Sequence, residues 1–434
     1  METLLFGFVV LIGIIVVASI INEKKLHIPH DISLLLVAFL ISLGFLGLQK
    51  LNLFGFAEKL QEWNLFQDFP FNHFLLECML GFMMFAGASK VHFQKFVKNV
   101  LPIGYLAIIT TFISSVSYGI LFYGISSLFH LDIDLWLCIL LGGILSPTEP
   151  SAATGVLSKL GVSKSLISTI EGESLFNDGV GVAILVFVTE LIRKGTMHNF
   201  FAIVFQEFLG AILVGLGISY FLFKLLKMTN EPIVHILISL LAVSASYLLC
   251  EYFGFSGIIA SAICGMYFSY QNRKVARWRE VVDPKDLYYD FWSIIGNLLS
   301  GILYVLVGLS VISMKMNLLT LILVPIAVLI NLLSRGIGVG VSTVFIGKKK
   351  IPGHYSFLEF ISLMTLSGLR GGLSLALIMS IRDLFSIQVY EILFNVTMIT
   401  ILFTTIVQGL IIGKVYERIE KGREEKRMIL LKKS

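Results

Sequence analysis

Thirteen long apolar segments follow one another along this chain of 434 residues. An α-helix needs about 20 mostly apolar residues to cross a bilayer, and the hydrocarbon core tolerates only backbone that satisfies its own hydrogen bonds. Hydrophobic residues make up 56% of the chain and charged residues 14%, which excludes a soluble globular domain. The sequence therefore predicts an all-α membrane protein with about thirteen transmembrane helices. Their approximate bounds are 3–22, 31–48, 70–88, 100–127, 134–158, 167–192, 199–226, 232–252, 254–271, 287–313, 317–346, 355–381 and 386–413.

Basic residues are distributed unevenly over the connections between these spans. One set of alternate loops, taken with the C-terminal tail and with Lys224 at the end of the seventh span, holds 25 of the 33 Lys and Arg residues, and the opposite loops hold six. Cationic side chains resist translocation, so the richer side is predicted to be cytoplasmic. With an odd number of spans, we expect the N-terminus outside and the C-terminus in the cytoplasm. The expected location is the inner (plasma) membrane of a bacterial cell.

Two segments outside the spans are predicted to lie along the membrane surface. The tail, residues 414–434, is short and mixed in charge, which is typical of a helix on anionic headgroups. Segment 49–69 contains Trp63, Phe66 and several charges, and it is predicted to be an interfacial helix on the outer face.

Neither cysteines nor net charge points to a cofactor or a nucleic acid. Cys78, Cys138, Cys250 and Cys264 all fall inside apolar segments, without the spacing of a metal site or a disulfide framework. The formal charge of +5 comes from the loops and the tail, where membrane orientation explains it. We therefore expect no cofactor and no nucleic-acid partner.

Seven charged residues are predicted to lie at membrane depth. Each costs about 2.5 to 3.5 kcal/mol on insertion scales, so each needs a partner or an aqueous cavity. For any one of them an interhelical ion pair is as good an interpretation as a functional role. Their clustering in the fifth and sixth spans favours function. The seven are Glu77, Glu149, Glu171, Glu173, Asp178, Arg335 and Arg370.

Two spans carry sequences that interrupt a helix. The fifth contains Ser-Pro-Thr-Glu-Pro at 146–150, whose prolines remove backbone donors and clash with preceding carbonyls. An ordinary proline kink is the alternative. The twelfth contains Ser-Gly-Leu-Arg-Gly-Gly at 367–372. Two interrupted spans seven apart indicate an inverted-repeat transporter with its binding site between the breaks.

The sixth span divides its polar residues between two helix faces. At about 100° per residue, Glu171, Ser174 and Asp178 share one face, whereas Glu173 lies about 140° from Asp178. Asp178 and Ser174 can offer oxygen ligands towards the break in the fifth span. Glu173 points elsewhere and suits an arginine, and Asn177 is expected to hold the geometry of the site.

At these residues the chain resembles the NhaP/NHE group of Na⁺/H⁺ exchangers, among the monovalent cation:proton antiporters. Segment 173–178, Glu-Ser-Leu-Phe-Asn-Asp, is similar to the family signature Glu-Ser-Leu-Leu-Asn-Asp. Segment 368–371 resembles the family's Gly-Leu-Arg-Gly motif, and Arg335 resembles the arginine of the preceding helix. The segment around Glu77 is similar to the family's third helix, though more weakly. The resemblance covers nearly the whole membrane region.

The resemblance implies a fold with two interrupted, crossing helices and a homodimeric assembly. A transmembrane domain over residues 1–413 would precede the short cytoplasmic tail. Within it, spans 4 to 6 and 11 to 13 would form a transport core. That core would move against a dimerisation domain of spans 1 to 3 and 8 to 10, and span 7 would link the two.

The resemblance also implies the activity, an electroneutral one-for-one exchange of Na⁺, or of K⁺ or Li⁺, for a proton. Electroneutrality is associated with Asn177 before Asp178, where electrogenic relatives have a second aspartate. The chain has Glu149 where the family usually has Asp, which leaves selectivity and stoichiometry open. Bound Na⁺ or K⁺ is expected at Asp178, Ser174 and Thr148, with Glu149, Asn177 and Glu77 as further site residues. The resemblance further implies a structural ion pair between Glu173 and Arg335, and Arg370 is expected to support the break of the twelfth span.

Asp178 is expected to act as the carrier. It would bind either a dehydrated cation or a proton, and since one carboxylate cannot hold both, competition would enforce exchange. A K⁺/H⁺ antiporter remains an alternative. A cation channel is a less favoured one, because a channel can also use buried carboxylates.

An enzyme is disfavoured by the sequence. No His-Glu-x-x-His motif occurs. His27 and His30 stand close to Asp31 in a short loop and are only a weak candidate for a metal site.

Overall fold

The computed structural model describes residues 2–50, 79–91, 93–131, 133–194, 200–276 and 284–433. Within these ranges all regular elements are helices. Nine of the described helices are long and apolar enough to cross a membrane, and the bent pair α17 (Phe357–Ser367) and α18 (Gly372–Ser380) makes a tenth. The predicted all-helical membrane architecture is confirmed, whereas the described residues do not fix the number of spans at thirteen.

Nine of the predicted spans coincide with single helices. The first of these are α1 (Glu2–Ile21), α2 (His30–Lys50), α5 (Leu80–Lys90), α11 (Lys164–Lys194) and α12 (Phe200–Leu226). The others are α13 (Pro232–Tyr252), α14 (Gly257–Ala276), α15 (Pro284–Ser310) and α16 (Leu318–Ile346). For the third span only its end, α5, is described. The predicted surface helix at 49–69 lies outside the described residues beyond the end of α2.

The other four spans are composed of helices in series. After the short α6 (Phe93–Lys98), the fourth span consists of α7 (Val100–Gly104), the π-helix η3 (Tyr105–Thr110) and α8 (Thr111–Leu128). The fifth is divided into α9 (Leu135–Ile144) and α10 (Ser151–Lys159), and the twelfth into α17 and α18. The last runs through α19 (Ile387–Leu402), the π-helix η8 (Phe403–Gln408) and α20 (Gly409–Lys433).

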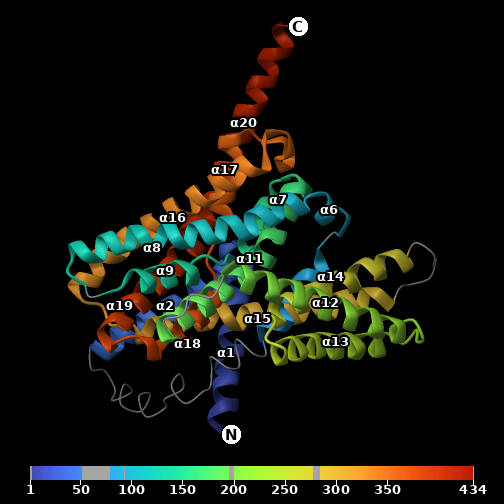
Figure 1. Ribbon diagram of the computed structural model, residues 1–434, viewed down its shortest axis with the longest axis horizontal. Coiled ribbons are helices and arrows are strands. Elements are labelled where there is room, and N and C mark those ends of the chain that lie inside the picture. Colours follow the sequence, from blue (N-terminus) through green and yellow to red (C-terminus); the bar gives the residue numbers. More distant parts are fainter. Residues whose placement is uncertain are drawn as a thin grey trace.

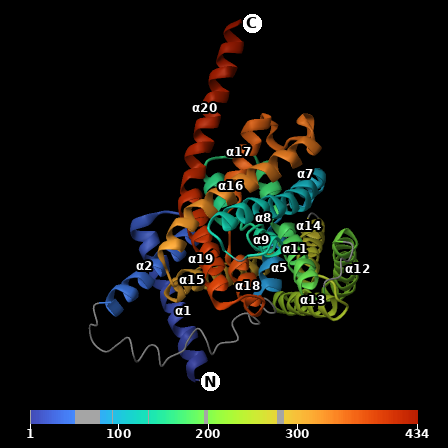
Figure 2. The ribbon, with the colours of Figure 1, turned by 60° about the vertical axis from the view of Figure 1, so that its left-hand side comes forward.

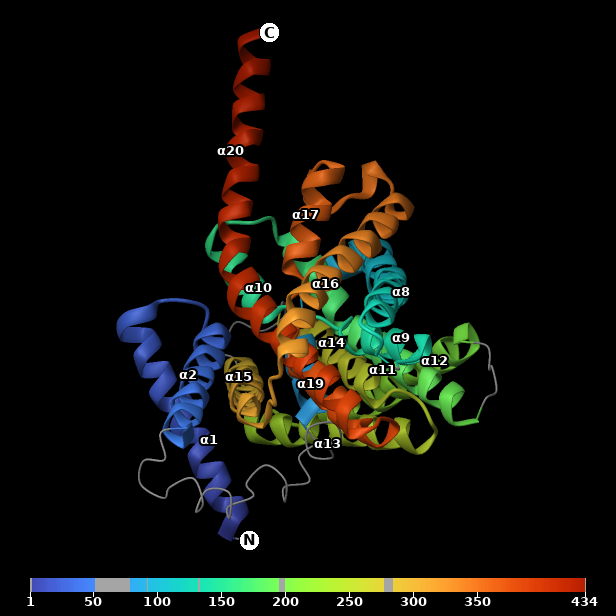
Figure 3. The same ribbon diagram turned by 90° about the vertical axis from the view of Figure 1, so that its left-hand side faces the viewer.

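The helices pack into two groups. In the first, α8 packs on α9 and α16, α9 also packs on α11, and α19 packs on α16 and α18. In the second, α5 packs on α14 and α15, and α2 packs on α15. An aromatic core joins the second group, where the rings of Phe85 and Trp292 lie 4.3 Å apart between centroids. Figures 2 and 3 show α1 and α2 together at one edge of the molecule.

The C-terminal helix differs from the expectation of a tail lying on the membrane surface. Helix α20 continues from Gly409 to Lys433, so the predicted tail extends the last span instead of turning away from it. No proline interrupts this stretch, and a glycine at 422 costs a helix only about 1 kcal/mol. Figure 1 shows α20 projecting from the body of the molecule, with the two chain ends at opposite extremes.

Candidate functional site

The two interrupted spans meet at their breaks. Between α9 and α10 the chain is irregular over residues 145–150, and α17 and α18 are bent by 61° at the second break. The amide of Glu149 donates to the carbonyl oxygen of Leu369 at 2.8 Å, which joins the two breaks directly. Ser374, in the first turn of α18, donates to the Ile144 carbonyl at the end of α9 at 2.6 Å. Each break therefore satisfies polar backbone atoms of the other.

Arg370 fills the space between the breaks. One terminal nitrogen, Nη1, donates to the carbonyl oxygens of Ser146 at 2.5 Å and Pro147 at 3.2 Å. The other, Nη2, donates to the Asn331 side chain of α16 at 3.0 Å. Carbonyls in the irregular segment that follows a helix have no partner within the helix and carry partial negative charge, which a cation offsets. The Arg370 guanidinium therefore also stabilises the break of the fifth span, in addition to the expected support for the break of the twelfth, in which the residue itself lies.

Glu173 and Arg335 form a buried ion pair between α11 and α16. The guanidinium donates to both carboxylate oxygens, at 2.5 and 2.9 Å, and also to the Met364 carbonyl at 3.2 Å. Glu173 is 1% exposed and Arg335 is 2% exposed. A Cβ on Gly368 would stand 2.7 Å from Nε of Arg335, so the first glycine of the second break leaves room for the arginine.

Hydrogen bonds attach the sixth span to the break of the fifth. The Asn177 amide nitrogen donates to the Thr148 hydroxyl at 2.7 Å, and the Thr148 amide donates to the Asn177 side-chain oxygen at 3.4 Å. The Ser174 hydroxyl donates to the Thr148 carbonyl oxygen. Asn177 thus holds the conformation of the break and leaves the next residue, Asp178, directed elsewhere.

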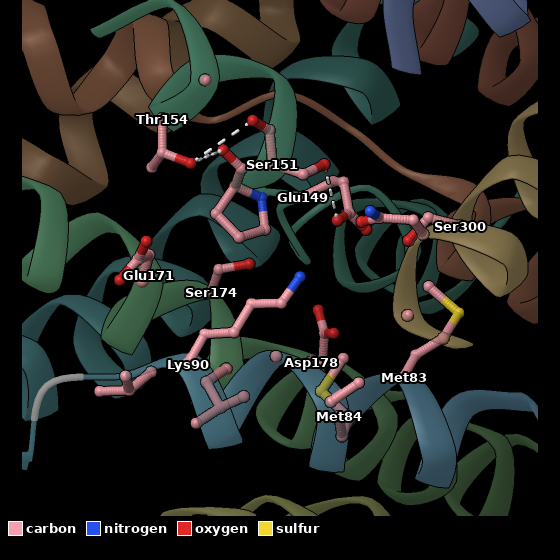
Figure 4. A pocket seen from close by; sticks show the side chains of 18 of the residues that line it. Met83, Met84, Lys90, Glu149, Ser151, Thr154, Glu171, Ser174, Asp178 and Ser300 are labelled. Atoms are coloured by element: carbon pink, nitrogen blue, oxygen red, sulfur yellow. Dashed lines mark hydrogen bonds between the residues drawn. The ribbon is translucent and has the colours of Figure 1, made fainter. Parts of the chain in front are cut away.

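Asp178 faces a cavity of about 340 Å³. Figure 4 shows its carboxylate, the Ser174 hydroxyl and the Glu149 carboxylate converging on this space. Asp178 is 6% exposed, and Ser151 at the start of α10 donates to Glu149 Oε1 at 3.1 Å. The polar and charged residues of the lining are Lys90, Glu149, Ser151, Thr154, Ser158, Glu171, Ser174, Asp178, Asn297 and Ser300.

The predicted site residues therefore separate into three sets. Asp178, Ser174 and Glu149 line the cavity together. Thr148 and Asn177 stand behind it and bond to each other, and Glu173 pairs with Arg335 away from it. Glu77 lies outside the described residues.

Sequence reasoning missed three residues of this region. Asn331 stands one helical turn before Arg335 in an apolar span, a spacing that could have marked it as a partner for a buried cation. Ser151 directly follows the second proline of the break and bonds to Glu149. Lys90 was counted as part of a loop, although it lines the cavity.

Comparisons with known proteins agree with this architecture. The family described as "Sodium/hydrogen exchanger, transmembrane" matches residues 8–418. The chain is 28% identical to the Na⁺/H⁺ antiporter NhaP of Pseudomonas aeruginosa, over 95% of this chain and 96% of that protein. It is 27% identical to the Na⁺/H⁺ antiporter NhaH of Halobacillus dabanensis, over 94% of this chain and 95% of that protein.

A solved structure shares the fold. The sodium proton antiporter MjNhaP1 of Methanocaldococcus jannaschii superposes with a TM-score of 0.72, at 21% identity, over 96% of this chain and 99% of that one. With a family match over nearly the full length and this fold, the chain is a multi-pass membrane transporter and not an enzyme. It belongs to the transmembrane family of sodium/hydrogen exchangers.

Proposed function

We propose that this protein exchanges a monovalent cation, Na⁺ first and K⁺ or Li⁺ as alternatives, for a proton, and that Asp178 carries both. The observation that carries the proposal is the Asp178 carboxylate, 6% exposed, which faces the cavity beside Ser174 and Glu149. The cation and the proton would bind to the same carboxylate in turn. An empty, charged carboxylate is costly to move through the membrane interior, so exchange would be favoured over leakage.

The oxygen atoms around the cavity suit an alkali cation. Carboxylate, hydroxyl and carbonyl oxygens are hard ligands, and the breaks of two helices leave carbonyls free to coordinate an ion. Ser174 and Glu149 are the proposed partners of Asp178. Thr148 stays a proposed ligand, supported by its position in the break, although its hydroxyl accepts a bond from Asn177. Glu77 stays a proposal from the resemblance alone.

Electroneutral exchange is supported by the neutral side chain that precedes Asp178. Asn177 bonds to Thr148 through its amide, so the pair 177–178 contributes one titratable group. In proteoliposomes we expect added Na⁺ to collapse a preset pH gradient, with Li⁺ and K⁺ tested in parallel. The rate of exchange should not depend on the membrane potential, which a potential-sensitive dye monitors in the same experiment. Exchange that follows the potential would contradict electroneutrality, and cation flux without proton counterflux would indicate a channel.

Glu149 is expected to tune cation preference. Glu149→Asp withdraws the carboxylate by about one carbon–carbon bond, about 1.5 Å. Exchange should persist. Because a small ion's coordination shell is sensitive to that distance, the ratio of apparent Na⁺, Li⁺ and K⁺ affinities should change by about threefold or more. Glu391→Asp, at a partly exposed glutamate bound to Lys315 away from the cavity, is the matched control. Unchanged affinities for all three cations would remove Glu149 from contact with the ion.

The two groups of helices support the proposed division into a moving core and a dimerisation domain. Residues of α5 and α15 line one wall of the cavity, and residues of α10 and α11 line the other, so the cavity lies between the groups. Movement of one group against the other would open it alternately to each side. A homodimer formed through spans 1 to 3 and 8 to 10 belongs to this proposal, and native mass spectrometry that found only monomer would contradict it.

The proposed orientation has the N-terminus outside and the C-terminus in the cytoplasm of a bacterial cell, across the inner membrane. It is supported by the distribution of basic residues, 25 against six, and by the opposite positions of the chain ends in Figure 3. Labelling of single cysteines introduced at both ends would test it, since access to both from one side would contradict the orientation.

A further inference from the structure

Lys90 brings a positive charge into the cavity. It is the last residue of α5, and its side chain lines the same space as Asp178. Figure 4 shows its ammonium directed between Ser174 and Asp178, opposite the wall formed by α11. The residue is nevertheless exposed, so it stands where the cavity opens. The long side chain of a lysine allows its ammonium to move several ångströms without a change in the backbone.

Carboxylates surround this ammonium. Glu149, Glu171 and Asp178 line the cavity, and Asp31 at the start of α2 lies within electrostatic range of Lys90. From α15 the described lining residues are neutral, namely Gly296, Asn297 and Ser300. Lys90 is therefore the single cationic group among the described residues that line the cavity.

The surrounding carboxylates stabilise this ammonium, but its position has a cost for a cation-binding site. A site that must attract Na⁺ is weakened by a like charge nearby, because the two repel and because both are attracted to the same carboxylates. A purely structural pairing with Glu171 would not require the ammonium to reach the space in front of Asp178. The position is better explained if Lys90 limits how tightly the cavity holds a cation, since an ion bound too tightly is released slowly.

We propose that Lys90 is a tethered cation that competes with the transported ion for the carboxylates of the cavity and so sets the apparent cation affinity. An entering Na⁺ displaces the ammonium towards the opening, and the ammonium returns when the ion leaves. Lys90 stands on α5 and the carboxylate carrier on α11, so the competition operates between the two helix groups. This inference rests on the proposed antiport function.

The test compares Lys90→Met with Lys90→Arg in proteoliposomes. At alkaline pH, where protons compete least, Lys90→Met should lower the KM for Na⁺ by about fivefold or more, because a nearby like charge has been removed. Lys90→Arg keeps the charge and should stay within about twofold of the unmodified protein. Lys98→Met, the same change on the exposed end of α6, is the matched control and should leave KM unchanged.

The KM readout separates competition from a structural role. Loss of a structural ion pair would lower the melting temperature and leave KM unchanged. A folded Lys90→Met protein whose KM stays within twofold of the unmodified value therefore overturns the proposal, and so does an equal fall in KM for Lys90→Arg. If Lys90→Met does not fold, Lys90→Gln is expected to give the same fall. Failure of the unmodified protein to exchange cations would instead contradict the proposed function.

Discussion

Asp178→Asn should abolish cation/proton exchange and leave a folded protein. Asparagine matches aspartate in size and keeps hydrogen-bonding capacity, but it has neither the charge that holds a cation nor a proton to exchange near neutral pH. Within the described part of the chain no hydrogen bond or ion pair engages the Asp178 carboxylate, so the substitution breaks no contact found there. A neutral amide is also easier to bury than a carboxylate, and the melting temperature should stay unchanged or rise.

The measurements are pH-gradient-driven exchange, thermal melting and cation-induced stabilisation of the purified variant. All cation-dependent responses should disappear while melting stays cooperative. Glu171→Gln makes the same chemical change in the same cavity, two turns earlier on α11, and should retain exchange with an altered affinity. A folded Asp178→Asn protein that still exchanged Na⁺ or K⁺ for protons would exclude Asp178 as the carrier. Glu149 or Glu77 would then be the stronger candidate.

The local features of this site could be predicted from the sequence. Pro147 and Pro150 interrupt a helix whatever surrounds them, since proline has no amide hydrogen, and α9 ends at Ile144 as this requires. The shared face of Ser174 and Asp178 follows from helical periodicity, and both residues line the cavity. Helix geometry predicted that Glu173 points away from Asp178, but it did not identify a partner. The pairing of Glu173 with Arg335 was predicted from the family resemblance.

Features that depend on how distant segments cross could not be predicted. Arg370 lies in the break of the twelfth span, but its guanidinium reaches carbonyls 224 and 223 residues earlier in the chain. Its partners depend on the close crossing of the two breaks, where a Cβ on Gly371 would stand 2.9 Å from Cβ of Glu149. The glycines indicated a break but not which segment it approaches. Lys90 was missed for a related reason, since a lysine at the end of a span is ordinarily a residue that fixes orientation.

Glu173→Gln should destabilise the protein strongly, because it leaves Arg335 buried with its charge unpaired. Removing one member of a buried pair costs about 3 to 5 kcal/mol, in contrast to the small net value of an exposed pair. Arg335 has few alternatives, since it is 2% exposed and its Nε already has no hydrogen-bond partner among the described residues. The variant should give less folded protein and a lower melting temperature, and any fraction that folds should keep its cation preference.

A matched control for this experiment lies at the surface of the same chain. Glu391→Gln makes the same change at a glutamate that bonds to Lys315 at 2.8 Å, but Lys315 is 75% exposed. Water and salt screen that pair, so its loss should cost only about 0 to 1 kcal/mol. A large difference in melting temperature between the two variants would attribute the effect to burial of the charge and not to the Glu-to-Gln change itself. If Glu173→Gln instead kept normal thermal stability and changed the selectivity among Na⁺, Li⁺ and K⁺, Glu173 would belong to the ion site. Its bond to Arg335 would then serve to position that site.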